Sequence, residues 1–222
     1  MNGSLVRQLI LKDLYLMRWM IAGSIVAGLV SIVMMPLGTV SAYVGGVSLI
    51  CVLVILNIFL ALTNVVQERK EKVMLFVLSL PVSTTEYTIA KALANFIAFA
   101  VPWTILTIAN VVVIDVSSMP NGILPFWIAI LGYLLSYFCA LLALTLVKDG
   151  TGWHTTAIVV GNVSVNFVIP FLLSRPSVTA NAKGNVAVWT SDLVAFIAIE
   201  ILAGLAALGV AVFVQSRRRD FI

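Results

Sequence analysis

Charged residues, cysteine and histidine are all scarce in this sequence. Only 10% of its 222 residues are charged, against about 25% in an average soluble domain. The two cysteines, Cys51 and Cys139, both lie in apolar runs, which excludes a disulfide framework and a cysteine-rich metal site. The single histidine, His154, leaves little room for histidine-based catalysis, and we expect it to lie at a membrane interface.

Motifs for nucleotide hydrolysis and for common hydrolases are absent as well. There is no G-x-x-x-x-G-K-[ST] phosphate loop, so we do not expect the chain to hydrolyse ATP by itself. It also lacks a G-x-S-x-G elbow, an H-E-x-x-H pair and clustered carboxylates. We therefore predict no catalytic residue, no metal site and no cofactor in this chain, and nothing in the sequence indicates a nucleic acid as a partner.

Apolar residues dominate what is present. They make up 62% of the chain, and the mean hydropathy is +1.14. A soluble fold of this size could not bury so much apolar surface, which indicates an integral membrane protein. The apolar runs are continuous, whereas barrel strands alternate, so the spans should be helices.

Six of these runs are long enough to cross a hydrocarbon core of about 30 Å, which takes about 20 helical residues. They are residues 19–38, 43–66, 93–114, 123–147, 155–173 and 193–214. We predict an all-α integral membrane protein with six transmembrane helices, forming a single transmembrane domain over residues 1–222.

Basic residues fix the expected orientation. With the N-terminus inside, 11 of the 13 Lys and Arg residues fall in cytoplasmic segments, and only Arg175 and Lys183 lie outside. The opposite orientation would reverse this count and violate the positive-inside rule. The sequence therefore predicts a multi-pass protein of the cell membrane with both termini in the cytoplasm.

The segment before the first span, residues 1–18, is expected to form an interfacial helix. Residues 4–17 carry one apolar stripe and several basic side chains that could meet anionic lipid headgroups. A plain extension of the first span is the alternative interpretation. The stripe consists of Val6, Ile10, Leu14 and Met17.

The loop between the second and third spans, residues 67–87, is longer and more patterned than a simple connection. Residues 68–80 predict a short amphipathic helix that begins with charges and ends before Pro81. Its apolar face is formed by Val73, Phe76, Val77 and Leu80. Ser83-Thr84-Thr85-Glu86 then has the form of a capping box that opens the third span. A helix held in this way could transmit a push from a soluble partner into the membrane. The alternative is a loop stabilised by its own charges and facing water.

At these residues the chain resembles a known family, the type-2 ABC exporter permeases. The resemblance lies in an ordered set of residues in the expected loop, together with the six-span layout and the short outer loops. The set comprises Glu68 and Glu71, then Leu78-Ser79-Leu80-Pro81-Val82-Ser83, then Glu86 and Lys91. Two positions depart from the family pattern: Lys72-Val73 stands where Gly-Thr is common, and Thr84 where Arg is frequent.

The resemblance implies a division of labour between chains. In that family this loop holds the coupling helix, which sits in a groove of a separate nucleotide-binding ATPase subunit. Two permeases and two ATPases form the working unit, with ATP and Mg²⁺ bound by the ATPase. By this resemblance Glu68 and Glu71 would meet the ATPase surface. The seat and the following turn would be formed by residues 78–83, among them Leu78, Leu80, Pro81, Val82 and Ser83. Phe76, Glu86 and Lys91 complete the predicted coupling residues.

Polar residues inside the spans are costly in a bilayer, so each needs a partner or a pathway. Glu200 lies about 12 Å along its helix from Asp192, a depth at which free exposure to lipid is unfavourable. It could face a pathway or an interface, or form a buried hydrogen bond. The amides could line the pathway or the permease interface, or could bond between helices. They are Asn57, Asn64, Asn162 and Asn166.

Three functions are compatible with six spans. The leading interpretation is the membrane subunit of an ATP-driven exporter, working as a homodimer or, alternatively, as a heterodimer of permeases. A second is a six-span substrate-binding membrane module of an importer, which would not need a charged coupling loop. A third, an intramembrane protease, is disfavoured because only Glu200 lies well inside a span. The apolar interior and short outer loops favour a hydrophobic or amphipathic substrate in contact with membrane lipid.

Overall fold

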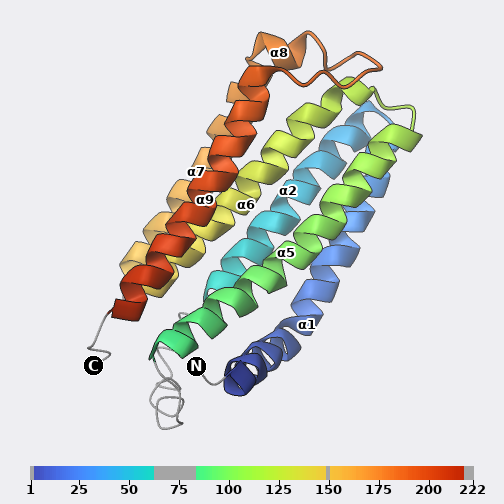
Figure 1. The fold of residues 1–222 in the computed structure, drawn as a ribbon. Coiled ribbons are helices and arrows are strands. Elements are labelled where there is room, and N and C mark those ends of the chain that lie inside the picture. The colour runs from blue at the N-terminus through green and yellow to red at the C-terminus, as the bar shows by residue number, and fades with distance from the viewer. Residues whose placement is uncertain (1–2, 63–83, 149–150, 218–222) are drawn as a thin grey trace.

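The computed structural model describes residues 3–62, 84–148 and 151–217. Six long helices run side by side along one axis in an elongated bundle (Figure 1). They are α1 (Gly3–Met34), α2 (Thr39–Ala61), α5 (Thr84–Val116), α6 (Leu124–Val147), α7 (Thr151–Leu173) and α9 (Ser191–Arg217). Shorter turns η1 (Met35–Leu37), η3 (Asn121–Ile123) and α8 (Pro176–Thr179) connect them. The described residues contain no strand.

All six helices are long and apolar enough to cross a membrane. The all-α fold with six predicted spans is therefore confirmed. Chain direction alternates from one long helix to the next, so that both termini lie at the same end of the bundle, at the bottom of Figure 1. Helix α2 ends and helix α5 begins at that end too, whereas α8 lies at the opposite end. We call these ends the terminal end and the α8 end.

A glycine makes the tight turn between the first two spans possible. Gly38, which caps the start of α2, has φ +154° and ψ 173°. Residues other than glycine rarely adopt this backbone conformation. Pro36 fixes the turn η1 just before it. Because the turn is so short, α2 already begins at Thr39, four residues earlier than the apolar run predicts.

The segment expected to lie in the membrane surface is helical, and it continues without a break into the first span as helix α1. At 1.5 Å per residue, the 32 residues of α1 extend about 48 Å, well beyond a hydrocarbon core of about 30 Å. Helix α5, with 33 residues, is just as long. Figure 1 shows the first turns of α1, in dark blue, running across the terminal end of the bundle at an angle to the rest of the helix.

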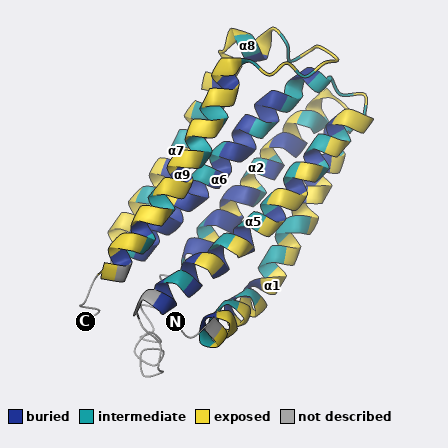
Figure 2. Ribbon diagram, viewed as in Figure 1, coloured by how far each residue is buried: buried dark blue, intermediate teal, exposed yellow. Residues whose placement is uncertain are grey.

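Helix α6 forms the centre of the bundle and is largely buried (Figure 2). It packs against α2, α5, α7 and α9, and apolar residues cover all of its faces. Phe138 stacks on Phe99 of α5 with ring centroids 4.2 Å apart, and both side chains are fully buried. Gly204 of α9 lies so close to α6 that a Cβ atom there would be 2.7 Å from the Cα of Ser136, the kind of small-residue contact that lets membrane helices approach each other.

The outer helices expose broad apolar faces. In Figure 2 much of α1, α7 and α9 is exposed, and the exposed side chains include Val30, Phe167 and Leu202. Exposed apolar surface of this extent is unfavourable in water but suits contact with lipid tails or with another membrane helix.

Candidate functional site

Most of the predicted coupling residues lie outside the described part of the chain, as does Asn64 of the predicted intramembrane amides. The coupling residues in question are Glu68, Glu71, Phe76, Leu78, Leu80, Pro81, Val82 and Ser83. The structure describes the two that follow them, Glu86 and Lys91, both in the first turns of α5. The chain is already helical at Thr84, whereas Ser83 of the predicted capping box lies outside the described residues.

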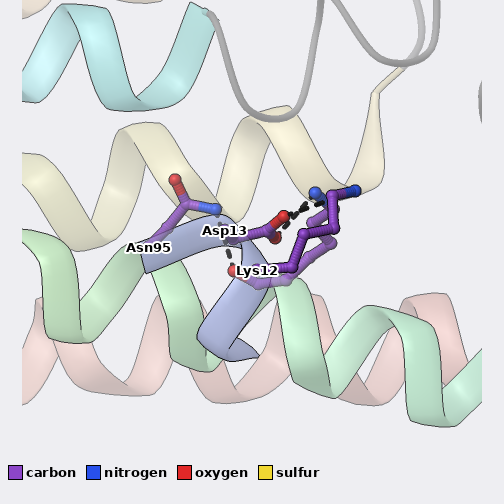
Figure 3. A network of polar contacts seen from close by, with 4 residues as sticks. Lys12, Asp13 and Asn95 are labelled. Atoms are coloured by element: carbon purple, nitrogen blue, oxygen red, sulfur yellow. Dashed lines mark hydrogen bonds and ion pairs between the residues drawn. The ribbon is translucent and has the colours of Figure 1, made fainter. Parts of the chain in front are cut away.

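Lys91 forms a buried ion pair with Asp13 of helix α1 (Figure 3). The Lys91 Nζ atom donates to the Asp13 Oδ2 atom at 2.7 Å, and the two residues are 78 positions apart in the sequence. Their side chains are only 5% and 2% exposed, respectively. A charge-assisted hydrogen bond of this length is strong. Because the pair is buried, salt screens it much less than it screens an ion pair on the surface. It joins the start of α5 directly to the first part of α1.

Neighbouring polar groups extend this contact. Lys12 Nζ lies 3.8 Å from the second carboxylate oxygen of Asp13, and its side chain is 45% exposed. Asn95, one turn further along α5, donates its Nδ2–H to the backbone oxygen of Lys91 at 2.8 Å. The ring of Tyr87 lies with its centroid 5.8 Å from Lys91 Nζ. In Figure 3 dashed lines join the carboxylate of Asp13 to two lysine amines.

Three consecutive polar side chains near the start of α5 are buried. Glu86, Tyr87 and Thr88 are each less than 10% exposed, although they are polar and lie in the first turn and a half of the helix. A carboxylate in this position is favoured by the partial positive charge of a helix N-terminus. Polar residues are seldom buried unless they are paired, and this one turn contains three buried polar residues. We call the junction formed by Asp13, Lys91 and Asn95 the α1–α5 junction.

The apolar stripe of the N-terminal segment faces the protein rather than the lipid. Val6 and Met17 are buried, and Met17 packs in a cluster with Leu60 of α2 and Ala92 of α5. Asp13 lies on the same face, seven residues after Val6 and four before Met17, which is the spacing of one helix side. Helix α5 therefore covers part of this stripe, at Met17.

Sequence reasoning selected Lys91 but missed Asp13. The signal was present: one acidic residue interrupts an apolar stripe in a segment otherwise rich in basic residues. A buried carboxylate needs a cation, but α1 and α5 are too far apart in the sequence for spacing alone to pair them.

The predicted intramembrane amides are not brought together by hydrogen bonds among the described residues. Asn162 and Asn166 donate to the backbone oxygens of residues four positions earlier in their own helix, at 2.9 Å each. Asn166 is exposed on the surface of α7. Asn57 is buried on α2, and neither of its amide atoms has a hydrogen-bond partner within the described ranges.

Glu200 belongs to a polar cluster between α6, α7 and α9. It is half-buried, and its Oε2 atom is enclosed without a hydrogen-bond partner among the described residues. It lies one helical turn before Gly204, on the side of α9 that packs on α6, and close enough to Tyr133 for electrostatic interaction. The Tyr133 hydroxyl group is hydrogen-bonded to that of Ser164 on α7. Sequence reasoning did not select Tyr133, whose role depends on how the three helices meet.

Within the described residues no group of three or more His, Cys, Asp or Glu side chains is placed to hold a metal ion. The sequence model described as ABC-2 family transporter protein matches residues 8–217, which include all six spans. No curated protein and no solved structure matches the chain.

Proposed function

The chain belongs to the ABC-2 transporter family, as a permease subunit with six spans, and we propose that it works as an exporter driven by separate ATPase subunits. The loop at residues 67–87 is the contact with the ATPase, with Glu68 and Glu71 on its surface and residues 78–83 as the seat and turn. ATP and Mg²⁺ bind to the partner chain, in keeping with the lack of a phosphate loop here.

The observation that carries this proposal is the α1–α5 junction. Helix α5 begins at Thr84, within the last residues of the loop, so a displacement of the loop reaches α5 first. The buried ion pair between Lys91 and Asp13 makes α1 follow α5, because separating two buried charges without water is costly. The two longest helices of the bundle then move as a unit when the ATPase closes.

Two features support a pathway between two copies of the permease. Asn166 exposes an amide beside exposed apolar side chains of the same helix such as Val163 and Phe167, and an amide in lipid needs water or a partner. Glu200 places a carboxyl group in the same half of the bundle, with one oxygen unpartnered within the described ranges. A homodimer with these groups near the pathway would accommodate a hydrophobic or amphipathic substrate.

The placement of charge supports a cytoplasmic location for both termini. Helices α6 and α9 end at the terminal end with Lys148 and Arg217, and α1 contributes its own basic residues there. Arg175 and Lys183 flank α8 at the opposite end. The positive-inside rule then makes the terminal end cytoplasmic in the cell membrane and the α8 end external.

Affinity purification from gently solubilised membranes tests the proposal. We expect an ATPase subunit to co-purify with the wild-type chain and to be lost from a variant carrying Glu68→Ala, Glu71→Ala and Leu80→Asp. A matched control removes two exposed charges at the α8 end, Asp115→Ala and Lys183→Ala, and should retain the ATPase.

Recovery of the intact wild-type chain without any ATPase would refute the proposal. The importer module would then be the next function to test, by analysing the purified chain for a tightly bound small ligand. Family membership favours the permease over that alternative.

A further inference from the structure

A cavity of about 600 Å³ lies at the α8 end of the bundle. It is bounded by the first half of α2, the start of α6 and the last turns of α7. Helices α2 and α7 both pack on α6, which forms the back wall with Phe126 and Trp127. The volume is in the range of small-molecule sites, about 300–1,000 Å³.

The floor of the cavity is rigid and apolar. Phe126, Trp127 and Met35 are buried members of the main apolar cluster. Gly46 on α2 allows the Trp127 ring to pack closely, because a Cβ atom at that position would lie 2.8 Å from a ring carbon. None of the lining residues carries a charge, so the cavity favours an uncharged apolar group.

The cavity opens sideways rather than only at the end of the bundle. Three of its large apolar or aromatic lining residues are well exposed: Tyr43 is 74% exposed, Val47 60% and Leu173 46%. The first two lie on α2 and the third on α7, so the mouth lies between these two helices. Because both helices are membrane spans, the mouth faces the interior of the membrane.

Polarity changes along the length of the cavity. Hydroxyl groups line its upper rim at Thr39 and Ser118, next to the turns that join the spans, whereas Ile50 lies deepest on α2. From Thr39 to Ile50 the helix rises about 16 Å. Such a slot, polar at one end and apolar below it, matches a molecule with a polar head and a hydrocarbon chain. Tyr43 at the mouth is typical of residues at the boundary between headgroups and acyl chains.

We propose that this cavity binds the hydrocarbon chain of a lipid-like amphipathic molecule that enters sideways from the membrane leaflet at the α8 end. The polar head stays at the rim beside Thr39 and Ser118, and the chain extends down α2 against Trp127. The proposal depends on the membrane placement of the helices and not on ATPase coupling or on the direction of transport.

Photolabelling of the purified chain in phospholipid nanodiscs tests this site. The probe is a lysophosphatidylcholine with a diazirine at the end of its acyl chain. We expect the label on peptides from residues 39–50 and 124–131, and we expect excess unlabelled lysophosphatidylcholine to compete with it. Ala42→Trp fills the cavity from α2 and should lower this labelling by about tenfold or more.

Val44→Trp is the matched control, because Val44 lies on the same helix and is exposed but does not line the cavity. Its labelling should stay within about twofold of the wild-type chain. If Ala42→Trp prevents folding, Val47→Trp narrows the exposed mouth instead and should also reduce labelling. A thermal melting curve of each variant verifies the fold.

Two results would overturn the proposal. One is labelling spread evenly over the apolar surfaces and unchanged in the cavity variants. The other is an unlabelled cavity together with an inter-chain disulfide in a Val47→Cys, Cys51→Ser chain, which would mean that a second copy covers the mouth. Because the assay needs no ATPase, neither result bears on the coupling proposal.

Discussion

Replacing Lys91 by methionine should destabilise the protein markedly. The substitution keeps most of the side-chain length but leaves the carboxylate of Asp13 buried, at 2% exposure, without its close partner. Removing one member of a buried ion pair costs about 3–5 kcal/mol, because the remaining charge is not solvated. Lys12 Nζ, 3.8 Å away and partly in solvent, compensates in part, so we expect a loss near the lower limit, about 3 kcal/mol.

The loss is measurable as a lower melting temperature of the purified chain in detergent. For a chain of this length, about 2–4 °C correspond to each kcal/mol, which gives a decrease of roughly 6–12 °C. Lys12→Met is the matched control, since it removes a half-exposed amine on the other side of the same carboxylate. An exposed pair contributes at most about 1 kcal/mol, so this variant should melt within a few degrees of the wild-type chain.

A double variant separates the charge effect from a packing effect. Asp13→Leu combined with Lys91→Met removes both charges, and apolar replacement of a buried pair is often neutral or stabilising. The double variant should therefore recover most of the stability that Lys91→Met alone loses. If Lys91→Met melted like the wild-type chain, or if the double variant were no more stable than the single one, the buried ion pair would not hold α5 to α1 as argued here.

Three further predictions concern packing and orientation. Gly204→Val should lower the melting temperature by pushing α9 away from the backbone of α6, whereas Gly209→Val, with open space around it, should not; equal effects would contradict the close contact. Phe99→Ala should cost about 3–5 kcal/mol in stability, as expected for a fully buried ring, and a loss below 1 kcal/mol by thermal melting would contradict its stacked, enclosed position. In a chain whose native cysteines are replaced by serine, Lys183→Cys should react with a membrane-impermeant maleimide added to intact cells, and Arg217→Cys only after lysis; the reverse result would invert the topology.

The coupling region illustrates how far motif reasoning reaches. The ordered acids, the Leu-Pro-Val-Ser segment and Lys91 pointed to the permease family, and the match over residues 8–217 confirms that family. Eight of the ten predicted coupling residues lie outside the described ranges, so their contact with an ATPase stays a prediction. The partner of Lys91 could not be found in the same way, because no local pattern links residues on α1 and α5.

The N-terminal segment shows a different limit. Its apolar stripe correctly indicated a helix with one apolar side, but periodicity does not say what covers that side. A lipid surface and the apolar side of a neighbouring helix can both cover such a stripe. The structure decides for the neighbouring helix, because α5 is long enough to extend beside the first turns of α1, where Met17 packs beside Ala92.

The sequence by itself determined that the protein lies in a membrane, how many spans it has and to which family it belongs. These depend on composition, on the length of apolar runs and on a local motif, all of which can be read along the chain. Only the tertiary structure decided which polar groups meet, namely Asp13 with Lys91 and Tyr133 with Ser164. It also decided that Trp127 lines the cavity between α2 and α7. The membrane-spanning parts of the described helices are apolar on nearly all sides, so hydrophobic periodicity does not specify which of their faces pack together. That choice depends on close contacts of small residues and on a few buried polar pairs.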